Sequence, residues 1–152
     1  MEGFSEKLNE LLMSAFQSVL KIEEQALHRM GSPRLSISEA HLLEVVGKGG
    51  EGGRSMSELA KALSVAPSSI SIAIQKLEGK GMLKRTKGEK DARIVWITLT
   101  EAGSRANRRH THFHEMMVSS IAGDIAEDEQ IVLLRAMQHL NEHFERRLIR
   151  KS

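Results

Sequence analysis

The residues best suited to chemistry in this chain are histidines placed one helical turn apart. His110 and His114 have the i, i+4 spacing that puts two side chains on one face of a helix. Neutral imidazoles at that spacing suit Zn²⁺. The alternatives are a polar cavity lining or buried histidines that form hydrogen bonds. His139 and His143 repeat the spacing, and there a solvated helix face is the simpler interpretation.

Other kinds of reactive site are missing from the sequence. It has no cysteine, which excludes disulfides, thiolate metal sites and a thiol redox switch. It contains no G-x-S-x-G turn, no HExxH motif and no phosphate loop, since Gly47-Lys48-Gly49-Gly50 lacks a preceding strand and the Lys-Ser/Thr ending. A metal-dependent enzyme built on His110 and His114 would need a general base that the sequence does not offer. We therefore expect no enzyme activity and no required cofactor, with zinc as the one candidate metal.

The distribution of charge indicates a different chemistry, the binding of a polyanion. The whole chain carries a net charge of only +2 over 152 residues. Residues 1–66 carry a net charge of −2, and residues 94–152 balance. Residues 67–93 hold seven basic and three acidic side chains, a net charge of +4. A basic island of this kind suits contact with nucleic acid, and a solvated surface without a partner is the alternative.

The basic island coincides with a predicted helix-turn-helix followed by a β-hairpin. Hydrophobic periodicity, capping boxes and turn residues define the elements. They predict four helices: over the first thirty residues, from Ser36 to about Val46, from Ser55 through Leu63 and from about Ser68 to Lys80. Two strands follow at Met82–Thr86 and Ile94–Leu99, and then two more helices, from Thr100 to about Ile121 and beyond Gly123-Asp124. The fold class is therefore mainly α with a small β-hairpin wing: a winged helix-turn-helix with six helices.

In this arrangement the helix over Ser68–Lys80 is the recognition helix, which fits the major groove, and the hairpin is the wing. Ile70, Ala73, Ile74 and Leu77 form its packed face. Gln75 can read adenine, Ile72 can touch a thymine methyl or be an ordinary surface aliphatic, and the serines combine helix-start and DNA roles. In the wing, Arg93 can enter the minor groove, and Asp91 is expected to form a salt bridge with it. The expected DNA contacts are Ser68, Ser69, Ser71, Ile72, Gln75, Lys76, Arg85, Lys87, Lys90 and Arg93.

Several motifs in this order resemble the MarR family of winged helix-turn-helix regulators. They are Ser57-Glu58-Leu59-Ala60, the run from Leu77 to Arg85, Asp91-Ala92-Arg93 and the run from Leu99 to Gly103. The resemblance covers nearly the whole chain. It implies an intertwined homodimer, with residues 1–33 and 100–152 as the helical dimerisation region and 34–99 as the DNA-binding region of a single MarR-type chain over 1–152. Two recognition helices would then enter successive major grooves of a pseudo-palindromic operator.

Two subgroups of the family are the most similar. Stretches such as Val19 to Glu24, Ser36 to His41 and His110 to Val118 resemble the repressors of fatty-acid synthesis in Gram-positive bacteria. That resemblance implies acyl-acyl carrier protein, or a small apolar ligand, as effector. The zinc-sensing subgroup implies a metal site at Glu24, His41, His110 and His114, although its second site uses a cysteine that this chain lacks.

The sequence therefore predicts an effector-controlled transcriptional repressor that binds double-stranded operator DNA in a bacterial cytoplasm, at the nucleoid. The first interpretation of the effector is acyl-acyl carrier protein, and the alternative is a zinc-responsive repressor. A winged-helix protein–protein adaptor is the rival from another class. No apolar run is long enough to span a bilayer, so no membrane partner is expected.

Overall fold

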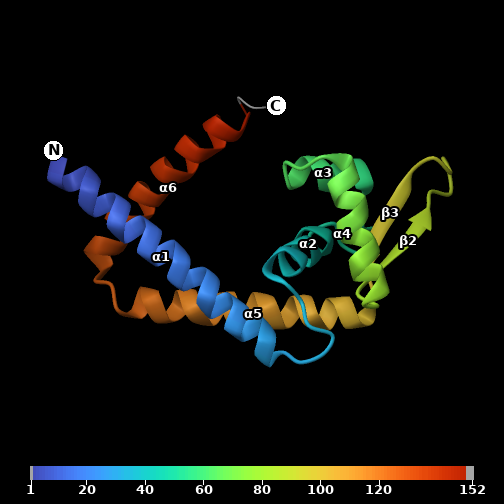
Figure 1. The fold of residues 1–152 in the computed structure, drawn as a ribbon, viewed down its shortest axis with the longest axis horizontal. Helices are drawn as coiled ribbons and strands as arrows, with labels where there is room; N and C mark the ends of the chain where they lie inside the picture. The colour runs from blue at the N-terminus through green and yellow to red at the C-terminus, as the bar shows by residue number, and fades with distance from the viewer. Residues whose placement is uncertain (1, 150–152) are drawn as a thin grey trace. The chain divides into compact units, whose positions relative to one another are not determined.

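The computed structural model describes residues 2–149, which form six α-helices and one three-stranded antiparallel sheet (Figure 1). Contacts divide the chain into two compact units, Met1–Thr111 and His112–Ser152. The predicted mainly α winged fold is confirmed. The elements are α1 (Glu2–Arg29), α2 (Ile37–Gly47), β1 (Arg54–Ser55), α3 (Met56–Ala62), α4 (Pro67–Gly79), β2 (Leu83–Lys87), β3 (Val95–Leu99), α5 (Glu101–Gly123) and α6 (Glu127–Ile149).

Capping boxes set the starts of α2 and α3, as the sequence predicts. The Ser36 hydroxyl accepts from the Glu39 backbone N–H at 3.1 Å, and the Glu39 carboxylate accepts from the Ser36 N–H at 2.9 Å. Ser55 and Glu58 make the same reciprocal pair at 3.2 and 2.8 Å. These bonds satisfy backbone donors that a helix leaves free at its first turn, so both helices begin at fixed residues.

The sheet contains one strand more than the predicted hairpin. β2 and β3 pair antiparallel with Leu83 opposite Leu99, and β1 adds to the other edge of β3, giving the order β1-β3-β2. A two-residue strand is too short to show any alternation in the sequence. Gly53, with φ +71, precedes β1 and lies so close to β3 that a Cβ there would meet the Ile97 carbonyl oxygen at 2.1 Å. This glycine therefore allows the third strand to approach.

The hydrophobic core of the first unit lies between α2, α3, α4 and the sheet. Its fully buried side chains include Leu43, Leu59, Ile74, Leu77 and Ile97. The start of α5 packs tightly on this core. Its Gly103 lies so close to the chain at Met82 that a Cβ on this glycine would meet the Met82 carbonyl oxygen at 2.0 Å. α4 and the β2–β3 hairpin are thus fixed to one core.

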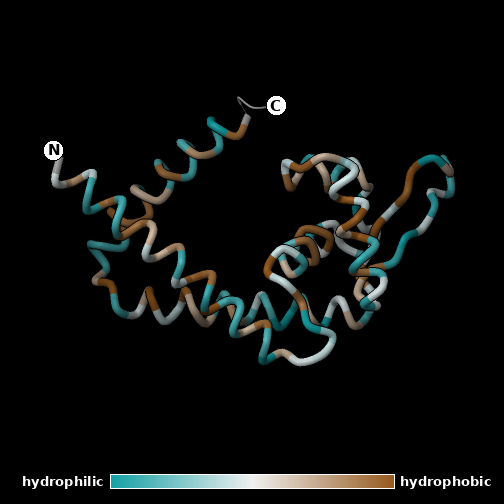
Figure 2. The backbone as a smooth tube through the Cα atoms, in the orientation of Figure 1, coloured by the Kyte–Doolittle hydropathy of each residue, from teal (hydrophilic) through white to brown (hydrophobic). Residues whose placement is uncertain are grey.

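Large apolar side chains remain exposed along α1, in the first unit, and along α6, in the second. Phe4, Leu11 and Phe16 of α1 are 72%, 55% and 57% exposed, and Leu134 and Leu148 of α6 are 66% and 60% exposed. Figure 2 shows brown and teal alternating along both helices. Exposed apolar stripes of this kind mark an association surface. None of the described helices is long and apolar enough to cross a membrane.

Candidate functional site

The recognition helix α4 buries one face and exposes the other. Ile70, Ile74 and Leu77 are at most 2% exposed and fix the helix to the core. On the opposite face Ile72 is 57% exposed, Ser71 is half-buried, and the remaining outward side chains are exposed: Ser68, Ser69, Gln75 and Lys76. The expected DNA-reading side chains of α4 therefore form one outward strip of hydroxyl, amide, ammonium and aliphatic groups.

Ion pairs tie the last turn of α4 to its neighbours. Glu78 accepts from the guanidinium of Arg85 in β2, so Arg85, expected among the DNA contacts, links the recognition helix to the wing. Just beyond α4, Lys80 donates to the Glu39 carboxylate of α2 at 2.7 Å and to the Arg34 carbonyl at 2.7 Å. Burial would raise the pKa of Glu39, but its bonds to Lys80 and Ser36 hold the pKa below the usual value. The lysine thus faces an ionised partner at neutral pH.

The wing presents basic side chains at its tip, between β2 and β3. Lys87 and Lys90 are exposed, and the Arg93 side chain is 91% exposed. Arg93 donates to Asp91 through its backbone N–H at 3.0 Å, Nε at 3.1 Å and Nη2 at 3.2 Å. These bonds hold the pKa of the Asp91 carboxyl below its usual value, so the pair is ionised at neutral pH. In Figure 2 β2 and the tip are hydrophilic, whereas β3 is hydrophobic.

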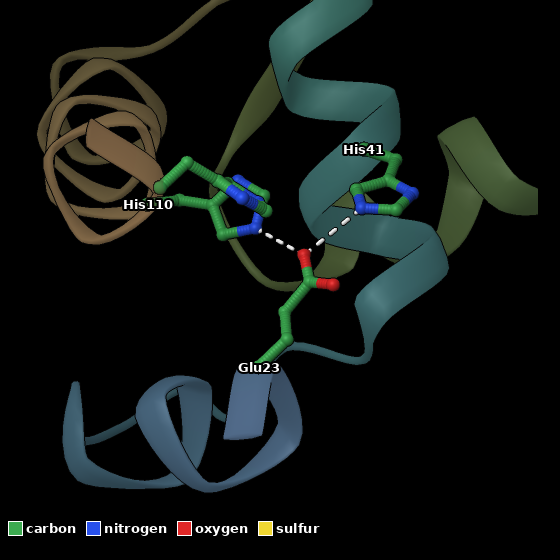
Figure 3. A group of neighbouring side chains, drawn as sticks. Glu23, His41 and His110 are labelled. Atoms are coloured by element: carbon green, nitrogen blue, oxygen red, sulfur yellow. Dashed lines mark hydrogen bonds and ion pairs between the residues drawn. The ribbon is translucent and has the colours of Figure 1, made fainter. Parts of the chain in front are cut away.

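A cluster of two histidines and a glutamate, of which Glu23 and His110 are buried, joins three helices of the first unit (Figure 3). Glu23 Oε1, from α1, accepts from His41 Nε2 of α2 at 2.9 Å and from His110 Nε2 of α5 at 2.6 Å. The side chains of Glu23 and His110 are 3% and 2% exposed, whereas that of His41 is 46% exposed. One carboxylate oxygen thus bridges two imidazoles, and His41 opens the cluster toward solvent.

The register of α1 corrects one expected ligand. Glu24, named from the resemblance, is exposed, and Glu23 contacts both histidines instead. The physical reason is the buried stripe of α1, which contains Glu23 and, one turn later, Leu27 at 2% exposure. Adjacent helix residues diverge by about 100°, so Glu24 cannot share this face. His114 follows His110 by one turn of α5, and that spacing puts both on one face of the helix.

The donor set of this cluster fits zinc. Two imidazole nitrogens and one carboxylate oxygen, all within 4.8 Å of one another, are typical Zn²⁺ ligands. The same contacts also suit a purely structural network, in which an ionised carboxylate satisfies two ring N–H groups. Both interpretations agree that Glu23 links the long helix α1 to α2 and α5.

Sequence reasoning missed Glu23 and the cations beside the start of α2. Glu23 and Glu24 are the same type of residue, so only the position of the buried stripe along α1 indicates which of the two carboxylates is buried. Leu20, Glu23 and Leu27 follow an i, i+3, i+7 pattern that could have located the buried face. The contact of Lys80 with Glu39 joins residues 41 positions apart, for which the sequence carries no local signal.

Comparisons with known proteins agree on one family. The sequence profile described as "MarR family" matches residues 35–94. The chain is 33% identical to FabT of Streptococcus pneumoniae, solved in complex with DNA, with a TM-score of 0.85 and coverage of 93% of this chain and 97% of that one. It is 30% identical to the HTH-type transcriptional regulator BilQ of Clostridium symbiosum, covering 76% of this chain and 81% of the relative.

It is also 30% identical to the transcriptional regulator AdcR of Streptococcus pyogenes, over 73% of this chain and 65% of the relative. The chain spans about 65% of the length of the first three curated relatives that it matches. The matched stretch of the family profile includes α2, α3, α4, β1 and β2.

Proposed function

The chain belongs to the MarR family, and from this premise we propose that it is a homodimeric transcriptional regulator that binds double-stranded operator DNA. The observation that carries the proposal is the outward strip of α4, where Ile72, Gln75 and Lys76 are exposed while the opposite face is anchored in the core. A helix presented in this way fits the major groove, which is about 12 Å wide.

The wing supports the same function. It places Lys87, Lys90 and Arg93 on the hairpin that the Glu78–Arg85 pair ties to α4. Cations at a wing tip can reach the phosphate backbone and the narrow minor groove, where the potential is most negative. FabT, the solved relative that is 33% identical, was crystallised with DNA.

The exposed apolar stripes supply the reason to propose a homodimer. Each of α1 and α6 presents large apolar side chains that a soluble monomer rarely leaves uncovered. A second copy of the chain would cover them and would place two recognition helices about 34 Å apart, one turn of DNA. The two half-sites of a pseudo-palindrome then match the two-fold symmetry of the protein.

A salt-titrated gel shift separates this function from a protein–protein adaptor. The probe is the promoter upstream of the chain's own gene, with a scrambled duplex of equal length as control. We expect specific binding that weakens steeply with salt, because phosphate contacts release counterions. Absence of any specific shift, on this promoter and on a panel of others from the same genome, would support the adaptor instead.

We propose two alternative effectors, and we rank one of them before the other. The first is acyl-acyl carrier protein acting as co-repressor, and its support is the resemblance to the fatty-acid-synthesis repressors. The second is zinc, which the convergence of Glu23, His41 and His110 favours. These three residues would hold the ion, with His114 as a fourth donor by its helical spacing. Bound zinc would replace the two hydrogen bonds with metal–ligand bonds, and it would hold α1, α2 and α5 together.

Fluorescence anisotropy with the promoter distinguishes the effectors. Binding is measured with chelator, with zinc and with long-chain acyl-acyl carrier protein. Tightening only with the acyl protein supports the first effector and leaves the histidines structural. Tightening only with zinc, lost in both His110→Ala and His41→Gln, supports the second. The half-exposed His41 is included because its replacement disturbs the buried core less than that of His110.

A further inference from the structure

The recognition helix is flanked by different elements on its two sides. Glu78 turns toward the wing and pairs with Arg85, whereas Lys80 turns toward the start of α2 and pairs with Glu39. Lys80 is the C-cap residue of α4 and keeps right-handed helical backbone angles, so it lies about 200° around the helix axis from Glu78. The wing therefore lies along one side of α4 and the start of α2 along the other, with the outward strip between them.

On the side away from the wing lies a groove of about 960 Å³ between α1, the start of α2 and α4, here named the α2 groove. Its wall is rich in charge and contributes more cations than anions. The charged residues that line it are Lys21, Glu24, Arg34, Glu39, Lys76 and Lys80.

The charges of the α2 groove do not cancel. Lys80 and Glu39 neutralise each other at 2.7 Å. The remaining charges are three cations and the single carboxylate of Glu24, a net of +2. Arg34 and Lys76 are exposed, and within residues 2–149 neither side chain has a hydrogen bond or an ion pair. The groove thus holds cations that no anion of the described chain satisfies.

The α2 groove is continuous with the DNA-reading face of α4. Lys76 belongs to both, because it lies on the outward strip and also lines the groove. Ser38, in the first turn of α2, adds an exposed hydroxyl to the same wall. Arg34 is thereby placed beside the recognition helix on the side that the wing does not reach.

We propose that the α2 groove binds the phosphate backbone that borders the major groove opposite the wing. The proposal rests on the proposed function. A helix lying in the major groove has one phosphate strand on each side, so cations on the side away from the wing can contact the strand that the wing does not reach. Arg34 and Lys76 supply the charge, and the Ser38 hydroxyl can donate to a phosphate oxygen. The partner is the operator duplex itself, held by its backbone and not by its bases.

The test is the variant Arg34→Gln in the full-length protein, measured by anisotropy on the operator and on a scrambled duplex over a range of salt. We expect Kd to rise roughly threefold to tenfold at about 0.1 M salt, and the salt slope to fall by about one per half-site. Both duplexes should lose affinity by the same factor, because phosphates carry no sequence information. The Arg34 side chain is exposed and forms no hydrogen bond or ion pair within residues 2–149, so thermal unfolding should change little.

Two matched variants sharpen the test. Glu24→Gln removes the one unpaired carboxylate of the groove, and it should tighten binding, because that carboxylate would face phosphates. Arg29→Gln makes the same change of net charge at an exposed arginine outside the groove, so it should leave Kd within about twofold of wild type.

The proposal is overturned if Arg34→Gln matches Arg29→Gln, if Glu24→Gln fails to tighten binding, or if Arg34→Gln changes the ratio between operator and scrambled affinity. Failure of the proposed function is a different result, since wild type itself would then show no preference for an operator. In that case, residual weakening by Arg34→Gln on every duplex would still identify the groove as a phosphate site.

Discussion

Replacement of Glu23 should destabilise the fold far more than the same change at its neighbour Glu24. The Glu23 carboxylate is 3% exposed and accepts from two imidazoles at 2.9 and 2.6 Å. Glu23→Gln keeps the shape and one acceptor but loses the charge, so the free energy of unfolding should fall by about 1.5–3 kcal/mol, the contribution of a hydrogen bond to a charged group. Glu23→Leu removes the carboxylate that both rings share and should cost about 3–5 kcal/mol.

The assay is urea unfolding followed by circular dichroism, in chelator and at one protein concentration, because dimer stability depends on concentration. Glu24→Gln is the matched control, since Glu24 is exposed and its change should stay within about 0.5 kcal/mol. Equal effects of the two Gln variants would show that the register of α1 derived above is mistaken.

The remaining predictions concern DNA reading, packing and pH. Arg93→Ala should weaken binding to every duplex and lower the salt slope by about one per half-site, whereas Gln75→Ala should relax specificity at one base position, and a panel of operator variants measures both. Gly103→Ala should destabilise by about 1–3 kcal/mol because a Cβ would meet the Met82 carbonyl at 2.0 Å, while Gly123→Ala, with nothing within 4 Å, should be neutral or slightly stabilising. Because the pKa of Glu39 in the folded protein lies below its ordinary value of 4.5, the ion pair with Lys80 stabilises the fold fully at pH values above 4.5. This stabilisation is lost as the pH falls through the folded-state pKa. Glu39→Gln should therefore flatten the acid side of a plot of melting temperature against pH.

Local signals in the sequence were sufficient for most of the fold. The capping boxes at Ser36 and Ser55 place the starts of α2 and α3, because a cap acts through neighbouring residues alone. The recognition helix followed from Pro67 and from the apolar spacing of Ile70, Ile74 and Leu77. These features need no knowledge of the tertiary structure.

The parts that could not be predicted depend on contacts between distant residues. β1 exists only because β3 offers it an edge, and its two residues have no pattern of their own. The pairing of Arg85 with Glu78 and that of Lys80 with Glu39 depend on how α4 packs against the wing and α2. These contacts give Arg85 an ion pair that the sequence did not predict, and the expected DNA contact of Arg85 stays a prediction.

The most direct test of the central claim is the ratio of affinities for the chain's own promoter and for a scrambled duplex of equal length, measured by anisotropy at about 0.15 M salt. If the outward strip of α4 reads bases, the promoter should bind at least about a thousandfold more tightly, and Gln75→Ala should reduce that ratio. Equal affinity for the promoter, for a panel of other promoters and for the scrambled duplex would contradict the claim that this chain is a sequence-specific regulator.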